Sequence, residues 1–174
     1  MEIEKKYKVK ELPKEYELYC CKEIEQGYIC ENPVVRIRKI EEHHKNEEKK
    51  KIEYILTYKS KIGLKENIQV NAQVSHELEV PLTKEGYEHL KKKIDGNLIR
   101  KKRYVIPILG DLKAELDIFE GYLEGLVIVE VEFPNEEVVE QFIPPDWFGK
   151  EVTLDKRYTN KNLIYRRNLL DLEE

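Results

Sequence analysis

Apolar and polar residues alternate with a period of two in eight segments of the chain, and this pattern constrains the fold more than any other feature. Such alternation is typical of β-strands whose two faces meet different environments. The predicted strands span residues 2–10, 22–31, 33–41, 52–60, 74–81, 99–107, 112–120 and 126–133. So many short strands, joined by turns and helical stretches, predict an α+β domain built on an antiparallel sheet.

Helices are expected at three places between and after these strands. Thr83 and Asn135 can each cap a helix, so we expect helices over 83–94 and 135–143, and a third over 159–170. The segment Glu41–Lys51 contains no apolar residue and is expected to be a solvated hairpin loop. No repeat or boundary divides the 174 residues, so a single domain, 1–174, is expected.

The polar positions of the predicted strands carry pairs of like charge. Side chains two residues apart on a strand share one face at about 6.5–7 Å, where equal charges repel. The acidic pairs are Glu2 and Glu4, Glu77 and Glu79, Glu115 and Asp117, and Glu130 and Glu132; the basic pairs are Arg36 and Arg38, and Lys101 and Arg103. Something must neutralise these pairs, either one another or a bound ion.

A closed barrel would gather one face of every strand into one enclosed volume. We therefore predict an eight-stranded antiparallel β-barrel with a charged lumen and with helices packed on its apolar outer face. With Lys6 and Lys59, six basic side chains face eight acidic ones, which leaves a net charge of −2 before any metal is bound. Carboxylates suit Mg²⁺ or Mn²⁺ and guanidinium groups suit phosphate, so this lining fits a metal-chelated phosphate chain.

Composition excludes several other classes of protein. The formal net charge is −4, so no positive excess favours nucleic acid. No apolar run approaches the roughly 20 residues of a membrane span, and the amino-terminal residues MEIE do not resemble a secretory signal. We therefore expect a cytoplasmic protein with no membrane partner. Cys20, Cys21 and Cys30 match neither a zinc site nor a disulfide framework and are expected to be reduced.

A series of short motifs begins with Glu2-x-Glu4-x-Lys6. It continues with Gln26-Gly27-Tyr28, Arg36-x-Arg38, Lys59, Glu77-x-Glu79, Lys101-x-Arg103, Glu115-x-Asp117-x-Phe119, Gly125-Leu126, Glu130-x-Glu132, Trp147–Thr153 and Arg157-Tyr158-x-Asn160-x-x-Leu163. In number and order these motifs resemble the CYTH superfamily, also called triphosphate tunnel metalloenzymes, and most of all its compact bacterial branch. The resemblance runs from residue 2 to about 163. It implies an eight-stranded antiparallel tunnel that acts on triphosphates with Mg²⁺ or Mn²⁺.

The resemblance also implies roles for single residues. The implied metal ligands are Glu2, Glu4, Asp117, Glu130 and Glu132, and the implied phosphate ligands are Lys6, Arg36, Arg38, Lys59, Lys101 and Arg103. Glu77, Glu79 and Glu115 would orient these cations. Lys101 and Tyr28 match a Lys–Tyr pair implicated in catalysis in parts of the family, although simple packing at a hairpin end explains Tyr28 equally well.

The carboxyl-terminal part and one loop give less definite expectations. Lys150, Lys156, Arg157 and Lys161 form a basic run that we expect to be mostly solvated helix surface, the alternative being that it closes one tunnel mouth. Lys161 stands where a small polar residue is expected in related sequences. The charged loop over 41–51 is long for a compact member of the family, which leaves one tunnel entrance undefined.

The predicted function is the metal-dependent hydrolysis of inorganic triphosphate to pyrophosphate and phosphate. No nucleobase pocket is recognisable, which favours a small inorganic substrate over a nucleotide. Two alternatives stay open: a nucleotidyl (adenylate) cyclase or a thiamine or nucleoside triphosphatase that uses the same tunnel, and a polyphosphate-binding module without turnover. The expected partner is a small-molecule triphosphate, and the oligomeric state is open between monomer and homodimer.

Overall fold

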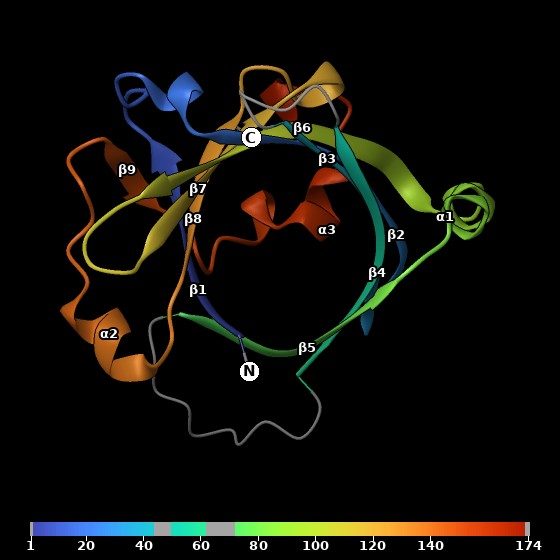
Figure 1. Cartoon of the computed structure of the whole chain (residues 1–174), viewed down its shortest axis with the longest axis horizontal. Helices are drawn as coiled ribbons and strands as arrows, with labels where there is room; N and C mark the ends of the chain where they lie inside the picture. The colour runs from blue at the N-terminus through green and yellow to red at the C-terminus, as the bar shows by residue number, and fades with distance from the viewer. Residues whose placement is uncertain (1, 44–49, 62–71, 173–174) are drawn as a thin grey trace.

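A closed ring of antiparallel strands forms the centre of the computed structural model, which describes residues 2–43, 50–61 and 72–172 (Figure 1). The strands of the ring are β1 (Glu2–Val9), β2 (Cys20–Glu31), β3 (Val34–His43), β4 (Lys51–Ser60), β5 (Gln73–Pro81), β6 (Asp95–Pro107), β7 (Lys113–Phe119) and β8 (Val127–Glu132). Their order is β5-β4-β3-β2-β6-β7-β8-β1, and pairing of β1 with β5 closes the ring. The predicted eight-stranded antiparallel barrel is confirmed.

The strand boundaries differ from the predicted ones in a few places. β6 begins at Asp95 rather than at residue 99, and a short strand that was not predicted, β9 (Phe148–Glu151), pairs with β1. The expected loop over 41–51 is shorter, because residues up to His43 continue β3 and Lys51 begins β4. Residues 44–49 of that loop lie outside the described residues. Cys20, Cys21 and Cys30 are free thiols, as expected.

The register of the strands puts the charged positions on one face. Glu4 lies opposite Glu132 and Lys6 opposite Glu130 across the β1–β8 pairing, while Tyr7, next to Lys6 in the chain, lies opposite Val129. Side chains alternate between the two faces of a strand, so the charged residues face the lumen and their apolar neighbours face outward.

Two helices pack on the outside of the ring. α1 (Lys84–Lys91) begins at Thr83, whose side chain accepts from the backbone N–H of Gly86 at 3.0 Å, and buries Tyr87 completely against the barrel. α2 (Glu136–Gln141) begins at Asn135 and packs Val139 on the outer core that includes Ile3, Tyr7, Leu116, Val129 and Val131. Both predicted caps are thus confirmed. Among the helices of the described ranges, none has the length and apolarity needed to cross a bilayer.

The carboxyl-terminal helix predicted over 159–170 is wrong in extent and in place. Its residues form a short α3 (Asn160–Leu163) between two single turns, η3 (Lys156–Tyr158) and η4 (Leu169–Leu172), and in Figure 1 α3 lies within the ring of strands. The turns η1 (Tyr16–Leu18) and η2 (Gly121–Leu123) connect strands elsewhere.

The carboxyl-terminal segment lies within the ring because part of the inner face of the barrel is apolar. Ile99, Phe119 and Ile128 lie two residues from Lys101, Asp117 and Glu130 and therefore face the same way. They form a second core whose carboxyl-terminal members are Val152, Tyr158, Leu163, Ile164 and Leu172. Because exposed apolar residues inside the barrel would contact water, covering them with the carboxyl-terminal segment is favourable. This segment therefore fills part of one end of the lumen.

Candidate active site

The strand ring encloses a cavity of about 800 Å³ with a charged lining. The residues predicted for the site that line it are Glu2, Glu4, Lys6, Tyr28, Arg36, Arg38, Lys59, Glu77, Glu79, Lys101, Arg103, Glu115, Glu130 and Glu132. Every strand of the ring contributes at least one of them. Side chains that are far apart in the sequence thus share one enclosed space, although the roles of the individual residues stay predictions.

Arg103 is the centre of the most buried ion-pair network of the cavity. Its Nε and Nη2 donate to the two oxygens of Asp117 at 2.6 Å each, and Nη2 also donates to Glu130 at 2.7 Å. Nη1 donates to Glu115, and Lys101 Nζ donates to Asp117 Oδ2 at 2.5 Å. Asp117 is fully buried behind these two cations and does not line the cavity. Its position suits orienting Lys101 and Arg103 more than contacting a ligand.

Burial shifts the pKa of two cations toward the neutral form. Burial and the neighbouring Arg103 lower the pKa of Lys101, and burial together with Arg36 lowers that of Arg38 to about 10. Arg38 is also paired with Glu79. A polyanion in the cavity would favour the charged forms of both side chains.

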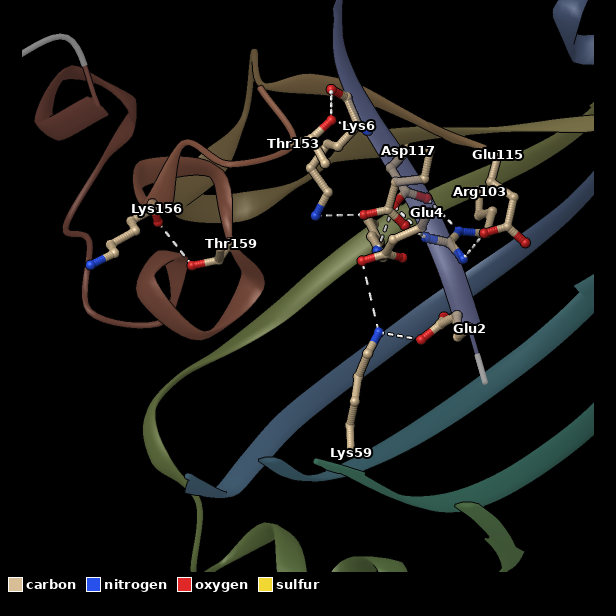
Figure 2. Close-up of polar contacts among 12 residues, drawn as sticks. Glu2, Glu4, Lys6, Lys59, Arg103, Glu115, Asp117, Thr153, Lys156 and Thr159 are labelled. Atoms are coloured by element: carbon tan, nitrogen blue, oxygen red, sulfur yellow. Dashed lines mark hydrogen bonds and ion pairs between the residues drawn. The ribbon is translucent and has the colours of Figure 1, made fainter. Parts of the chain in front are cut away.

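A cluster of carboxylates surrounds the ammonium group of Lys59 (Figure 2). The distances from Lys59 Nζ are 2.5 Å to Glu2 Oε2, 3.6 Å to Glu77 Oε2 and 3.8 Å to Glu4 Oε1. Burial and Glu130 raise the pKa of Glu4, and burial and Glu2 raise that of Glu77 to about 7. One ammonium group therefore does not fully compensate the acidic groups around it.

Glu132 belongs to the same acidic wall. It lies opposite Glu4 in the β1–β8 register. Burial raises its pKa, and the nearby carboxylates Glu2 and Glu115 raise it further. No ion pair involves it within the described part of the chain.

The carboxyl-terminal segment is fixed to β1 at Lys6. The backbone N–H of Lys6 donates to Thr153 Oγ1 at 3.1 Å, and the carbonyl of Lys6 accepts from Val152 N at 2.8 Å. The side chain of Lys6 pairs through Nζ with Glu130 Oε1 at 2.8 Å (Figure 2). This attachment brings Lys156 and Lys161 onto the cavity lining. Lys150 and Lys156 are exposed, as expected for a mostly solvated run, although Lys156 and Lys161 also line the cavity.

Sequence reasoning missed several further lining residues, among them Lys22, Gln26, Glu31, Glu53, Lys61, Gln73, Ser75, Thr153, Thr159 and Asn160. Lys22 and Gln26 lie an even number of residues from Tyr28 on β2 and share its face. Applying the period-two pattern to neutral residues and to single charges would have found them. With these additions, ten basic and nine acidic side chains of the described residues line the cavity. Among these residues, the predicted excess of negative charge is absent from the lining.

Tyr28 and Lys101 both line the cavity but occupy different levels. Lys101 lies opposite Ile24 in the β2–β6 register, whereas Tyr28 lies opposite Asp95. Four residues of β-strand correspond to roughly 13 Å. Tyr28 instead lies beside Arg36, opposite it on β3, and is one of the groups that raise the pKa of this guanidinium against the effect of burial. The two residues can thus contact different parts of an extended ligand.

A second group of potential metal ligands lies elsewhere. Ligand atoms of Glu23, Glu41 and His43 lie within 4.8 Å of one another. Glu23 and Glu41 alternate with the cavity residues Ile24 and Ile40, so they face the outside of the barrel. Glu41 is already paired with Lys39 at 2.5 Å. This group is separate from the cavity.

An eight-stranded antiparallel tunnel with charged side chains converging inside it defines the architecture of the CYTH class. Over 111 residues the chain is 40% identical to the inorganic triphosphatase of Nitrosomonas europaea, an alignment that covers 64% of the chain and 68% of that relative. It is 42% identical over 93 residues to the inorganic triphosphatase of Acetivibrio thermocellus, covering 53% of the chain and 57% of that relative. No protein-family model matches the chain.

The similarity extends over nearly the whole fold. The structure aligns with a crystal structure of the inorganic triphosphatase NE1496 with a TM-score of 0.63 and 31% identity, and the alignment covers 97% of each of the two chains. The chain therefore belongs to the CYTH superfamily, the triphosphate tunnel metalloenzymes, and its named relatives are inorganic triphosphatases.

Proposed function

We propose that this protein hydrolyses inorganic triphosphate to pyrophosphate and phosphate in its charged cavity, with Mg²⁺ or Mn²⁺ as cofactor. The observation that carries the proposal is that basic and acidic side chains from all eight strands line one cavity of about 800 Å³. The names of the relatives that share this fold support the same substrate.

The basic residues would bind the phosphate oxygens. Arg36 and Arg38 present guanidinium groups that suit bidentate contacts with phosphate, and Lys6, Lys59 and Lys101 add ammonium donors. A phosphoryl group in transfer spreads negative charge over its oxygens, so fixed cations around it stabilise the transition state. Lys101, whose pKa is lowered by burial and by Arg103, is suited to give up a proton to a leaving oxygen.

The acidic wall fits a hard divalent cation. Glu4 and Glu132 offer carboxylate oxygens, the ligands that Mg²⁺ and Mn²⁺ prefer. The pKa of each is raised, by burial first and then by neighbouring carboxylates, as expected for ligands that lack a compensating charge. Glu2, Glu130 and Glu132 together with Glu4 would hold the metal, which when bound would neutralise phosphate charge and position or activate water.

A substrate panel tests this proposal. Inorganic triphosphate, ATP, thiamine triphosphate and longer polyphosphate are each incubated with Mg²⁺, Mn²⁺ or chelator, and released phosphate and cyclic nucleotide are measured. We expect fastest phosphate release from inorganic triphosphate and none with chelator. A cyclic nucleotide formed from ATP, or release that is indifferent to chelator, would contradict the substrate or the cofactor assignment respectively. Saturable binding without release would indicate a binding module.

A further inference from the structure

Gln26 is a neutral residue beside the cations that β2, β3 and β6 place on the cavity wall, among them Arg38 and Lys101. It lies opposite Arg38 on β3 and opposite Ile99 on β6, and Lys101 is the next inward residue along β6. Its side chain is 1% exposed and lines the cavity. An amide in this position can contact whatever the neighbouring cations bind.

Its amide lacks the partner that a buried polar group normally has. Gln26 Nε2 is buried and has no hydrogen-bond partner among the described residues, and the same holds for Nε of Arg36 and Nε of Arg38. Leaving a buried donor unpaired costs about 1–3 kcal/mol, and more than nine in ten such groups find a partner in folded proteins. Three unpaired donors on two neighbouring strands are available to an acceptor that the described part of the chain does not supply, either a ligand or ordered water.

We propose that Gln26 is a phosphate-binding residue, whose amide donates to a non-bridging oxygen of inorganic triphosphate beside the contact of Arg38. This inference rests on the proposed function, which supplies the ligand. A half-turn about the last side-chain torsion exchanges the amide nitrogen and oxygen, so the donor can face the lumen without movement of the backbone.

A neutral donor suits this position better than another cation would. Burial and Arg36 lower the pKa of Arg38 to about 10, which shows that positive charge is already costly here. A lysine in place of Gln26 would add repulsion before any ligand is bound. The amide adds one hydrogen bond to the phosphate chain and no repulsion to the empty cavity.

Gln26→Met separates a binding role from a structural one, because Met matches Gln in length and has no amide. In the ligand-free protein, removing an unpaired buried donor should leave the melting temperature unchanged or raise it. Affinity for the imido analogue of triphosphate, whose bridging oxygens are replaced by NH to prevent hydrolysis, should fall about ten- to hundredfold, as for the loss of a hydrogen bond to a charged group.

Gln26→Glu is the second variant and Gln141→Met is the matched control. A glutamate at position 26 would pair with Arg38 and compete with the ligand, so affinity should fall further than in Gln26→Met. Gln141 lies exposed on α2, and its replacement should change neither property. Binding is measured by calorimetry with Mg²⁺ and with chelator, and stability by thermal melting.

The outcomes distinguish this inference from the proposed function. If Gln26→Met melts lower than the wild type and binds the imido analogue equally well, Gln26 is structural and the inference is overturned. If the wild type binds the analogue but releases no phosphate from triphosphate, the proposed hydrolysis fails while the Gln26 comparison is still decided by affinity. Binding that weakens in Gln26→Met and still more in Gln26→Glu supports the inference.

Discussion

Glu4 and Glu132 differ from the other acidic residues of the cavity in how little positive charge they meet. The nearest cation to Glu4 is Lys59 at 3.8 Å, whereas Glu130 is held by Lys6 at 2.8 Å and Arg103 at 2.7 Å. Attraction to these two cations outweighs burial and keeps the pKa of Glu130 well below its usual range. Of the four proposed metal ligands, Glu130 is therefore already paired with cations of the protein, and Glu4 and Glu132 carry the least compensated charge.

Replacing Glu132 by Gln should therefore remove activity and spare the fold. We expect kcat/KM for triphosphate to fall by about a hundredfold or more, because the loss of about 3 kcal/mol of transition-state stabilisation has that effect. Phosphate release at saturating Mg²⁺ measures it. Glu124→Gln, at an exposed position outside the cavity, is the control. Wild-type turnover in Glu132→Gln would remove this residue from the metal site.

Arg103 is expected to matter for stability as much as for binding. It is the common partner of Glu115, Asp117 and Glu130, and removing one partner of a buried ion pair leaves uncompensated charge, at a cost of about 3–5 kcal/mol. Arg103→Met should lower the free energy of unfolding in urea by this amount. Arg103→Lys should recover part of it.

The control for Arg103 is Arg167→Met, at an exposed position near the carboxyl terminus. It should unfold at the wild-type urea concentration. If Arg103→Met also did so, the network around Asp117 would contribute little to folding.

At the scale of elements, Glu25 attaches α1 to the barrel. This carboxylate accepts from Tyr87 Oη at 3.0 Å, from Lys91 Nζ at 2.6 Å and from Arg100 Nε at 3.1 Å. Burial alone would raise the pKa of Glu25, but these hydrogen bonds, that of Lys91 first, lower it below the ordinary value of 4.5. The ionised form is therefore the one that holds the helix.

Glu25→Gln should cost about 1 kcal/mol at pH 7, since the group is partly solvated. Because the pKa is lower in the folded than in the unfolded chain, this stabilisation is complete above about pH 4.5 and is lost as the pH falls through the folded-state value. Urea unfolding of both proteins between pH 7 and pH 3 measures the difference. Glu88→Gln, on the exposed side of α1, should show no such pH dependence.

Gly96 controls how the carboxyl-terminal segment fits into the ring. Its φ is +63°, and a Cβ there would lie 2.7 Å from the carbonyl oxygen of Ile164. That oxygen accepts from Asn97 N at 2.7 Å, so it cannot easily move. Gly110 has the same backbone conformation, φ +65°, with open space around it.

Gly96→Ala should therefore destabilise the protein more than Gly110→Ala. The strain of a left-handed residue costs about 1–2 kcal/mol at either position, and the clash at Gly96 adds about 1–3 kcal/mol. Thermal melting of both variants measures the difference. Equal losses would mean that the segment adjusts freely and is not seated against β6.

The position of the carboxyl-terminal segment inside the ring could not be predicted from the sequence. The eight strands were predictable because their alternation is local, and the like-charged pairs identified the lumen because both faces of a strand follow from its period. In the sequence, Leu163 and Ile164 fit the apolar stripe of an outer helix as well as they fit an inner core. Their real partners, Ile99 and Ile128, are distant in sequence, and only closure of the ring brings them together. Gln26 belongs to one of the motifs, but its place on the cavity lining was not predicted, because a single neutral residue forms no charge pattern.

At the scale of the whole molecule, the cavity holds cations and carboxylates that neutralise one another before any ligand is bound. Arg38 pairs with Glu79, Lys59 with Glu2, and Lys6 with Glu130. A phosphate chain that takes up these cations leaves carboxylates with less compensation, and a divalent cation is the natural partner for them. Metal and triphosphate should therefore bind with positive coupling, and the coupling must be reciprocal.

We expect Mg²⁺ to bind about 5- to 150-fold more tightly when the imido analogue of triphosphate is present, the range of 1–3 kcal/mol that is usual for coupled sites. The measurement is a matrix of melting temperatures over both concentrations, because each ligand stabilises the folded protein according to its own affinity. Chelation of Mg²⁺ by the analogue in solution is subtracted from a parallel titration without protein. Glu132→Gln is the matched variant, in which the analogue should still bind and the coupling should shrink. Melting shifts that simply add in the wild type would show that the phosphate-binding cations and the metal-binding carboxylates act independently. The ion pairs between these cations and carboxylates in the empty cavity would then not couple the binding of substrate to the binding of metal.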